Sequence, residues 1–138
     1  MDSTASFSFS EHLDRVASGP GVLRKGARTR ARLKAAAARV LNEQGYRGMQ
    51  ITEAAEEAWI SAGAIYKHFD NKRALVLEVL TDFIARNGEL LMAVPKQEDK
   101  YQQLVATNLC HVNIFASNVG LMRCVRHLSD ALPEFNKL

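Results

Sequence analysis

The side chains best suited to chemistry in this sequence are hydrogen-bond donors grouped between residues 61 and 73. Tyr66, Lys67 and His68 follow one another, and Lys72 comes four residues later. Phenol, ammonium and imidazole groups bind phosphate oxygens, and a lysine can also donate to the edge of a guanine. The residues just before them, Ser-Ala-Gly-Ala at 61–64, are small and would let the backbone approach a ligand closely. This grouping indicates nucleic-acid binding.

Other polar residues do not combine into a catalytic site. The sequence contains no glycine-rich phosphate loop, no Ser–His–Asp arrangement and no evident pair of buried carboxylates. Cys110, His111, Cys124 and His127 could suggest a metal, but their spacing matches no common zinc pattern. Packed core cysteines are the favoured interpretation. We therefore expect no enzyme activity, no metal and no cofactor, and we keep a metal- or thiol-responsive role for Cys110 and Cys124 as an alternative.

Two short helices would position the donors. Apolar residues recur at helical spacing over Ile51–Ala58, and Ser61 can cap a second helix over Ser61–Phe69. Only Trp59 and Ile60 lie between them, so the connection must be a sharp corner. Two short helices at a steep angle form a helix-turn-helix, whose second helix lies in the DNA major groove.

A basic segment precedes this motif. Residues 21–73 carry 11 basic and 5 acidic side chains, although the net charge of the whole chain is only +3. Positive charge concentrated on the segment that holds the motif is what phosphate binding requires. Part of it forms an arm before a helix predicted over Thr29–Gln44. We expect this arm to contact the phosphate backbone or the minor groove, with a solubilising leader as the alternative; its residues are Arg24, Lys25, Arg28, Arg30 and Arg32.

The rest of the chain also favours helices. We expect a flexible segment over residues 1–23 with a brief helical turn at 11–17, then, after the motif, a helix from Asn71 to about 87 or 92. Two further helices are predicted over 99–117 and 121–132, joined by a turn at 118–120. The first of these should direct one apolar face inward, formed by Tyr101, Leu104, Val105, Leu109 and Val112. Ala, Leu, Glu and Arg dominate and no alternating β-branched run occurs, so the fold class is all-α with no sheet.

A specific resemblance is visible in four places. These are Gly45-Tyr46, Ala54-Ala55, the run SAGAIYKHF at 61–69 and the run NKRAL at 71–75. Together they resemble the DNA-binding domain of the tetracycline-repressor-like (TetR) family of transcriptional regulators over about residues 28–80. The Tyr-x-His-Phe run followed by lysine is far more specific than a general helix-turn-helix pattern.

The resemblance implies a three-helix head joined by a fourth helix to a C-terminal helical bundle. The corresponding ranges are a flexible tail and basic arm at 1–27, a DNA-binding domain at 28–74 and a ligand-binding and dimerisation domain at 75–138. We find no counterpart of the helices that the family uses for dimerisation, so we expect either that this last domain is partial or that dimerisation uses another surface. The implied protein is a ligand-responsive repressor in the cytoplasm, with no membrane span, that binds a palindromic double-stranded DNA operator as a homodimer.

The same resemblance assigns site residues. The expected DNA contacts are Arg28, Arg30, Ser61, Ala62, Gly63, Ala64, Tyr66, Lys67, His68 and Lys72. A small-molecule effector would lie against Phe83, Tyr101, Val105, Leu109, Leu121 and Leu128, for which plain core packing is the alternative role.

Three positions depart from the family pattern. Met49-Gln50 stands where Thr or Ser usually caps the first motif helix, Ala54 replaces a larger aliphatic residue, and Trp59 replaces a corner glycine. A left-handed backbone at Trp59 would cost about 1–2 kcal/mol, and its ring could cover the volume missing at Ala54. With the glutamates of that helix, these departures motivate a second interpretation: a helical protein-interaction module that keeps the fold without sequence-specific DNA binding.

Overall fold

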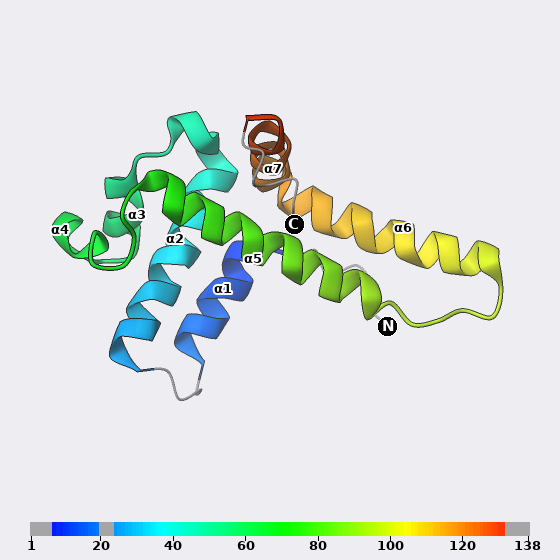
Figure 1. The fold of residues 1–138 in the computed structure, drawn as a ribbon. Coiled ribbons are helices and arrows are strands. Elements are labelled where there is room, and N and C mark those ends of the chain that lie inside the picture. Colours follow the sequence, from blue (N-terminus) through cyan, green and yellow to red (C-terminus); the bar gives the residue numbers. More distant parts are fainter. Residues whose placement is uncertain (1–6, 20–23, 132–138) are drawn as a thin grey trace.

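The computed structural model describes residues 7–19 and 24–131. Within these ranges the chain forms helices and no strand, which confirms the all-α prediction (Figure 1). Helix α5 runs through the middle of the molecule, α1 lies along α2, and α6 returns beside α5 (Figure 1). The helices are α1 (Phe9–Ser18), α2 (Lys25–Gly48), α3 (Ile51–Glu57), α4 (Ala62–Ile65), α5 (Lys72–Met92), α6 (Lys100–Ser117) and α7 (Val119–Ala131).

Short polar side chains begin several of these helices. The Asn71 side chain accepts a hydrogen bond from the backbone N–H of Ala74 at 2.9 Å, as a helix cap should. Helix α3 has no Ser or Thr at its start, but the Glu53 carboxylate accepts from the backbone N–H of Gln50 at 2.9 Å. The pairing supplies one arm of a capping box. The helix therefore begins at Ile51, as predicted, despite the residue change before it.

Helix α2 contacts both α3 and α5, and α3 contacts α4; helices α2, α3 and α4 and the first half of α5 are called the head. Its core is closed, because the side chains of Leu33, Ala54, Ile65 and Leu75 have no exposed surface. Helix α2 is bent at Gly45, whose φ of 77° is the left-handed conformation that glycine adopts without strain. The helix predicted to end at Gln44 is thus interrupted at Gly45. It then continues to Gly48.

Helix α1 corrects the expectation that the segment before residue 28 is a flexible tail and arm. Phe9, Leu13 and Ala17 are buried on one face of α1, and the Phe9 ring lies 5.2 Å from the ring of Phe83. Residues four apart share a helix face, so these three form an apolar stripe. Residues 1–6 and 20–23 of the expected tail lie outside the described part.

A buried asparagine marks the corner between α6 and α7. The Asn118 side chain accepts from the backbone N–H of Phe9 at 3.0 Å and donates to the carbonyl of Phe7 at 2.7 Å. From α2, the Asn42 side chain accepts from the backbone N–H of Leu121 at 3.2 Å. The predicted turn at 118–120 is thus a single residue, because α7 already begins at Val119.

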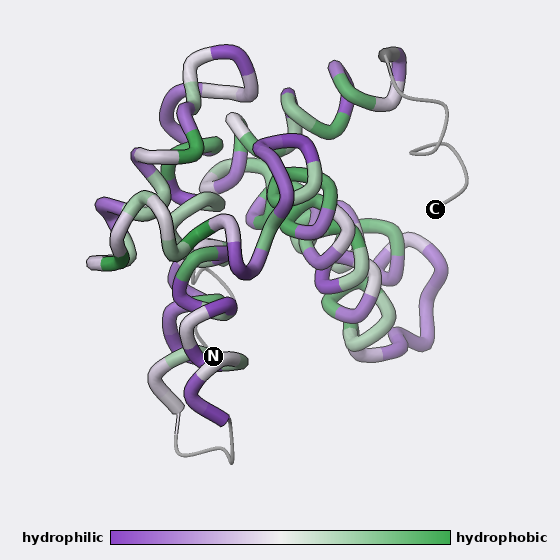
Figure 2. Tube along the Cα trace, turned by 60° about the vertical axis from the view of Figure 1, so that its left-hand side comes forward, coloured by the Kyte–Doolittle hydropathy of each residue, from purple (hydrophilic) through white to green (hydrophobic). Residues whose placement is uncertain are grey.

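Helix α6 differs most from its predicted packing. The face expected to lie inward is exposed, including Leu104 at 60% and Val112 at 61%, and Ile114 is the buried residue of this helix. Figure 2 shows the hydrophilic loop at 93–99 giving way to this more apolar helix. The periodicity located an apolar face correctly but could not show whether another element covers it.

Within the described ranges, none of the helices alone has the length and hydropathy needed to cross a bilayer. Helices α6 and α7 meet those two criteria only as a pair, and the pair is bent by 93°.

Candidate nucleic-acid interface

Helix α4 is shorter than the predicted helix over 61–69. The Ser61 hydroxyl accepts from the backbone N–H of Ala64 at 3.3 Å and starts a single helical turn. The chain then continues in tight turns, in which the Lys67 N–H donates to the Ala64 carbonyl at 3.1 Å and the His68 N–H to the Ile65 carbonyl at 3.0 Å. The predicted contact residues therefore remain on one compact, curled segment.

This segment has a buried side and an exposed side. Ile65 and Phe69 are buried and fix it against the head. The outward side carries small residues followed by donors, and the Tyr66 side chain is 53% exposed. The backbone of the small residues can approach a groove, while the donors can reach the flanking phosphates. The exposed predicted contacts here are Ser61, Ala62, Gly63, Tyr66 and Lys67, with Ala64 and His68 half-buried.

The corner before α4 is strained. Trp59 has a φ of 58°, and the N–H of Ile60 donates to the carbonyl of Ala55 at 2.9 Å. A left-handed residue followed by this bond is a Schellman-type helix end, where glycine is usual. The Trp59 side chain is 89% exposed, so the expectation that its ring covers Ala54 is wrong. The corner keeps its shape at a cost of about 1–2 kcal/mol in backbone strain.

Arg30, one of the predicted DNA contacts, has partners within the head. Its guanidinium donates to the backbone carbonyl of His68 and to the Glu78 carboxylate, the latter at 2.5 Å. It also lies over the Phe69 ring, 4.1 Å from the centroid. A guanidinium with these partners fixes the end of the α4 segment onto α2 and α5. We therefore assign Arg30 to positioning of the interface, while its contact with DNA stays a prediction.

The expected basic arm is the start of a helix. Helix α2 begins at Lys25, so the residues up to Arg32 are helical. The Arg32 side chain donates to the carbonyl of Ala58 at 2.8 Å, at the end of α3, where a cation is favoured by the helix dipole. Arg24, Lys25 and Arg28 are exposed. The arm is thus divided between cations that hold the motif and cations that face solvent.

Lys72 is held at the start of α5 by an aromatic ring. Its ammonium lies 4.4 Å from the centroid of the Tyr46 ring. An ammonium over an aromatic face is attracted by the quadrupole of the ring, and this attraction orients the Lys72 side chain. The sequence analysis used Tyr46 only as part of the family resemblance and did not predict this contact. The Gly45-Tyr46 pair was the only sequence signal for this contact. The helix is interrupted at Gly45, directly before the residue whose ring contacts Lys72.

The glutamates of α3 are largely satisfied within the head. Glu53 caps the helix, and Glu57 accepts from Arg39 at 2.9 Å, while Asp14 of α1 accepts from the same guanidinium at 2.6 Å. Partial burial alone would lower the pKa of Arg39, but the hydrogen bonds to Glu57 and Asp14 outweigh it and raise that pKa. Arg39 therefore stays charged and neutralises acidic groups that would otherwise repel phosphate.

The cysteines offer no sign of a reactive or metal site. Cys124 is buried, and burial raises the pKa of its thiol, which disfavours the reactive thiolate. Cys110 is half-buried, with its sulfur 3.8 Å from the carbonyl oxygen of Leu90. In residues 7–19 and 24–131, no three His, Cys, Asp or Glu side chains are grouped to hold a metal ion.

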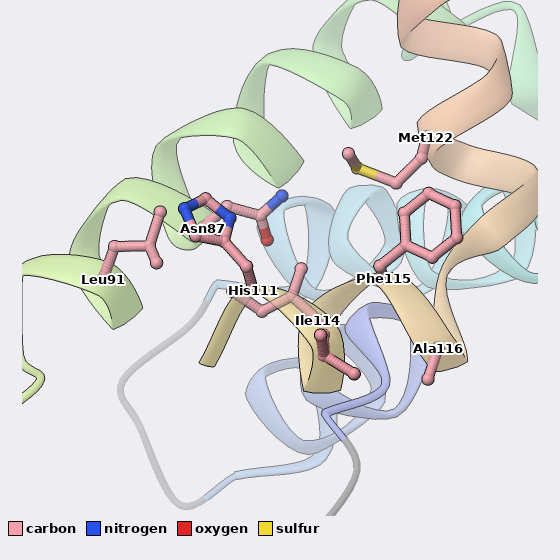
Figure 3. Close-up of a pocket in the computed structure, with 8 residues that line it drawn as sticks. Asn87, Leu91, His111, Ile114, Phe115, Ala116 and Met122 are labelled. Atoms are coloured by element: carbon pink, nitrogen blue, oxygen red, sulfur yellow. The ribbon is translucent and has the colours of Figure 1, made fainter. Parts of the chain in front are cut away.

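The predicted effector residues do not surround a common pocket. Phe83, Leu121 and Leu128 belong to the core, whereas Tyr101, Val105 and Leu109 are exposed on α6. A cavity of about 410 Å³ lies instead between α5, α6 and α7 (Figure 3). Its lining shares none of the six predicted positions and consists of Asn87, Leu91, His111, Val112, Ile114, Phe115, Ala116 and Met122.

Comparisons with known proteins point to one family. The family model of the bacterial regulatory proteins of the TetR family matches residues 33–79. The uncharacterized HTH-type transcriptional regulator YvkB of Bacillus subtilis (strain 168) is 32% identical over 82 residues, which are 59% of this chain and 42% of YvkB. A crystal structure from Mesorhizobium loti MAFF303099, of a protein assigned to the TetR-family transcriptional regulators, superposes with a TM-score of 0.68 at 21% identity. That superposition covers 83% of this chain and 60% of the other. The chain thus spans less than half of YvkB.

Proposed function

Because the chain belongs to the TetR family of bacterial regulatory proteins, we propose that it regulates transcription by binding duplex DNA with α4 in the major groove. The observation that carries this proposal is the two-sided α4 segment. Ile65 and Phe69 fix it to the head, while small residues and the donors of Tyr66 and Lys67 face outward. Family members are regulators, in agreement with the expectation that the chain is not an enzyme.

The proposed contacts fall into two groups. Tyr66, His68, Lys72 and Arg28 would bind phosphates and set the register of the head on the duplex. The face of α4 would meet base edges through Ser61, Ala62, Gly63 and Ala64, which can contact a thymine methyl, and through Lys67, which can donate to guanine. The Tyr46 ring beneath the Lys72 ammonium supports its inclusion, because the ring holds this charge at the helix start.

The remaining features are proposed for the whole regulator, of which this chain spans part. It would act in the cytoplasm as a homodimeric repressor on a palindromic operator, with half-sites about 34–36 Å apart. A small-molecule effector would change the spacing or tilt of the two heads. A coupling free energy of about 1–3 kcal/mol between effector and operator would be sufficient for a working switch. Helix α5 supports this proposal, since it runs from the head to the cavity that α6 and α7 line.

Selection of bound duplexes from a random pool tests the proposal directly. We expect an enriched palindrome, whose half-site spacing reports the dimer. Affinity for the selected DNA should fall steeply with salt, by orders of magnitude between 50 and 200 mM, because phosphate contacts release counterions. A pool that yields no enriched sequence, together with affinity that is flat in salt, would contradict it.

Variants separate the two groups of contacts. Tyr66→Phe and Lys72→Ala should weaken binding to all duplexes alike, and Lys72→Ala should reduce the salt slope by about 1. Lys67→Ala should change which half-site is preferred. Lys96→Ala, an exposed lysine in the loop after α5, is the matched control and should leave binding unchanged. A loss at Lys96 equal to that at Lys72 would show that the charge effect is not local.

The exposed Trp59 favours the second candidate, a protein-interaction module. The Trp59 ring is 89% exposed and offers a partner protein a large, flat apolar surface with one N–H donor. If this role is correct, the random pool should yield no selected sequence, and Trp59→Ala should abolish binding of a protein partner. Recovery of a palindrome by the Trp59→Ala variant would reject the module and retain DNA binding.

A further inference from the structure

A separate cavity lies where α7 meets the end of α2. Its volume is about 390 Å³, within the roughly 300–1,000 Å³ typical of ligand pockets. Helix α7 packs against α2 at the edge of the head (Figure 1). Both helices contribute basic side chains to the lining, which includes Arg47, Arg123 and His127. The cavity therefore joins the head to the rest of the molecule through a basic site.

The packing of α7 on α2 brings these basic residues together. Arg47 belongs to the last turn of α2. Arg123 and His127 are four residues apart on α7, so they lie on one face of that helix. Between them in the chain, Cys124 is buried, with its sulfur 4.0 Å from the backbone oxygen of α2 at residue 41. This contact holds the α7 face against α2, and the three basic side chains line the same cavity.

No carboxylate balances the charge of these residues. Among the described residues, the lining contains no Asp or Glu. Glu43 and Asp130 are the acidic residues of α2 and α7. Glu43 lines a different cavity, beside Trp59, and Asp130 lies outside the lining. Cys124 supplies no negative charge either, because burial raises the pKa of its thiol.

The arginines of this cavity differ from those that stabilise the head. Arg39 donates to two carboxylates, and Arg30 donates to a carboxylate and a backbone carbonyl. In the part of the chain that the structure describes, the side chains of Arg47 and Arg123 have no hydrogen bond or ion pair. A guanidinium without a protein partner keeps its N–H donors available for an acceptor from outside the chain.

We infer that this cavity binds a phosphate group, held by the guanidinium groups of Arg47 and Arg123 and by the imidazole of His127. A guanidinium can donate two parallel N–H bonds to a phosphate or a carboxylate. Two guanidinium groups without a counter-charge favour a doubly charged phosphate over a singly charged carboxylate. The inference goes beyond the proposed DNA contacts, since none of these three residues is among them. The phosphate belongs either to a free molecule or to the DNA backbone.

The cavity adjoins the proposed interface at Tyr46. This residue lines the cavity, and its ring centroid lies 4.4 Å from the Lys72 ammonium. Lys72 also opposes the rise in the pKa of the Cys124 thiol, as a positive charge near that sulfur should. A fourth positive charge therefore lies beside the site. A phosphate bound there would strengthen the contact between α7 and the head, because its donors come from both.

Pyrophosphate is a suitable probe, because it presents phosphate oxygens without a nucleoside. Calorimetric titration of the full chain, in a phosphate-free buffer at constant ionic strength, should show that pyrophosphate binds. Acetate should bind at least tenfold more weakly, since it carries one charge. Absence of pyrophosphate binding, or equal binding of acetate, would overturn the inference.

Three variants place the effect in the cavity. Arg47→Gln and Arg123→Gln each remove one guanidinium and should weaken pyrophosphate binding by about tenfold. Arg126→Gln removes the same charge from an exposed position of α7 outside the lining, so its affinity should equal that of the parent chain. Circular dichroism spectra establish that each variant is folded. A loss at Arg126 equal to that at Arg123 would contradict the assignment.

Titration with duplex DNA over a range of salt concentrations identifies the source of the phosphate. If the DNA backbone supplies it, Arg123→Gln should reduce the salt slope by about 1 relative to Arg126→Gln. If a free molecule supplies it, the two slopes should be equal, and only pyrophosphate binding should depend on Arg123.

The pyrophosphate titration separates this inference from the proposed function because it contains no DNA. Selection of a palindrome by a chain that does not bind pyrophosphate would reject the phosphate site alone. Pyrophosphate binding that depends on Arg123, in a chain that selects no duplex, would reject the regulator and retain the phosphate site.

Discussion

The head and helix α6 use apolar residues in opposite ways. In the head, Leu33, Ile65 and Leu75 are completely buried, and cations such as Arg30 tie the elements together. Helix α6 carries no Asp, Glu, Lys or Arg from residue 101 to 117, yet most of its large apolar side chains are exposed. The difference shows that an apolar helix face identifies a surface that can be buried, while packing partners decide whether it is.

The largest effect should come from truncating one leucine in each region. Leu33→Ala leaves a cavity in the closed core of the head and should lower the free energy of unfolding by about 2–5 kcal/mol. Leu104→Ala, on the exposed face of α6, should change it by less than about 0.5 kcal/mol. Urea denaturation measures both. A loss above about 1 kcal/mol for Leu104→Ala would show that the α6 face is covered in solution and would break the comparison.

Two glycines outside the head, Gly120 on α7 and Gly88 on α5, differ in how closely other atoms approach them. A Cβ at Gly120 would lie 1.9 Å from the backbone oxygen of Asn42, so Gly120→Ala must push α7 away from α2. We expect a loss of about 2–3 kcal/mol in the free energy of unfolding. Gly88→Ala on α5 meets no atom within 4 Å and should gain about 0.5–1 kcal/mol, because alanine favours helix. Thermal unfolding followed by circular dichroism should separate them, and similar melting temperatures would contradict the close approach of α7.

A substitution at the strained corner, Trp59, should increase the stability of the head. Trp59→Gly removes the left-handed strain but increases the entropy of the unfolded chain, so we expect a net gain of at most about 1 kcal/mol. Trp59→Ala keeps a Cβ at the same φ and is the control that should not stabilise. Unfolding by denaturant should be followed by circular dichroism. Tryptophan fluorescence cannot be used, because both variants lack the sole tryptophan of the chain. Equal stabilisation by both changes would point to the exposed ring instead of the backbone.

The smallest effect concerns His12 on α1. Burial lowers its pKa below the usual 6.5, and the nearby Arg86 and Arg15 lower it further, against an opposing effect of Glu89. Below pH 6.5 the unfolded chain therefore takes up this proton more readily than the folded chain. Stability should fall as the pH drops through this range. Unfolding of His12→Gln at pH 7.5 and 5.5 should show a smaller loss than the parent chain, and an equal loss would exclude His12 as the cause.

Local sequence signals were sufficient to predict most helices of the head. Caps and helical spacing placed α3 and α5, and the residue types of the α4 segment indicated its outward donors. The role of Arg30 was not accessible, because its partners His68 and Glu78 lie 38 and 48 residues away in the chain. A positive charge is visible in a sequence, but the group that neutralises it depends on the fold.

The segments outside the head were harder to predict for related reasons. The polar and small residues around Phe9 favoured a flexible tail, although Phe9, Leu13 and Ala17 repeat every four residues. Their burial depends on α2 and on Phe83, which no local pattern reveals. The apolar residues of α6 were visible from spacing, but the cavity that some of them line with α5 and α7 was not.

The contacts of Asn118 have a consequence for how the protein is made. They join Phe7 and Phe9 to a residue 109–111 positions later in the chain. A ribosome adding about 5–20 residues per second needs roughly 5–20 s to bridge that interval. Throughout it, the first helix to emerge lacks the group that ties down its leading end. The N-terminal end of α1 is thus among the last parts of this segment to reach its final place, and a nascent chain paused before Asn118 would still present that end to proteases and chaperones.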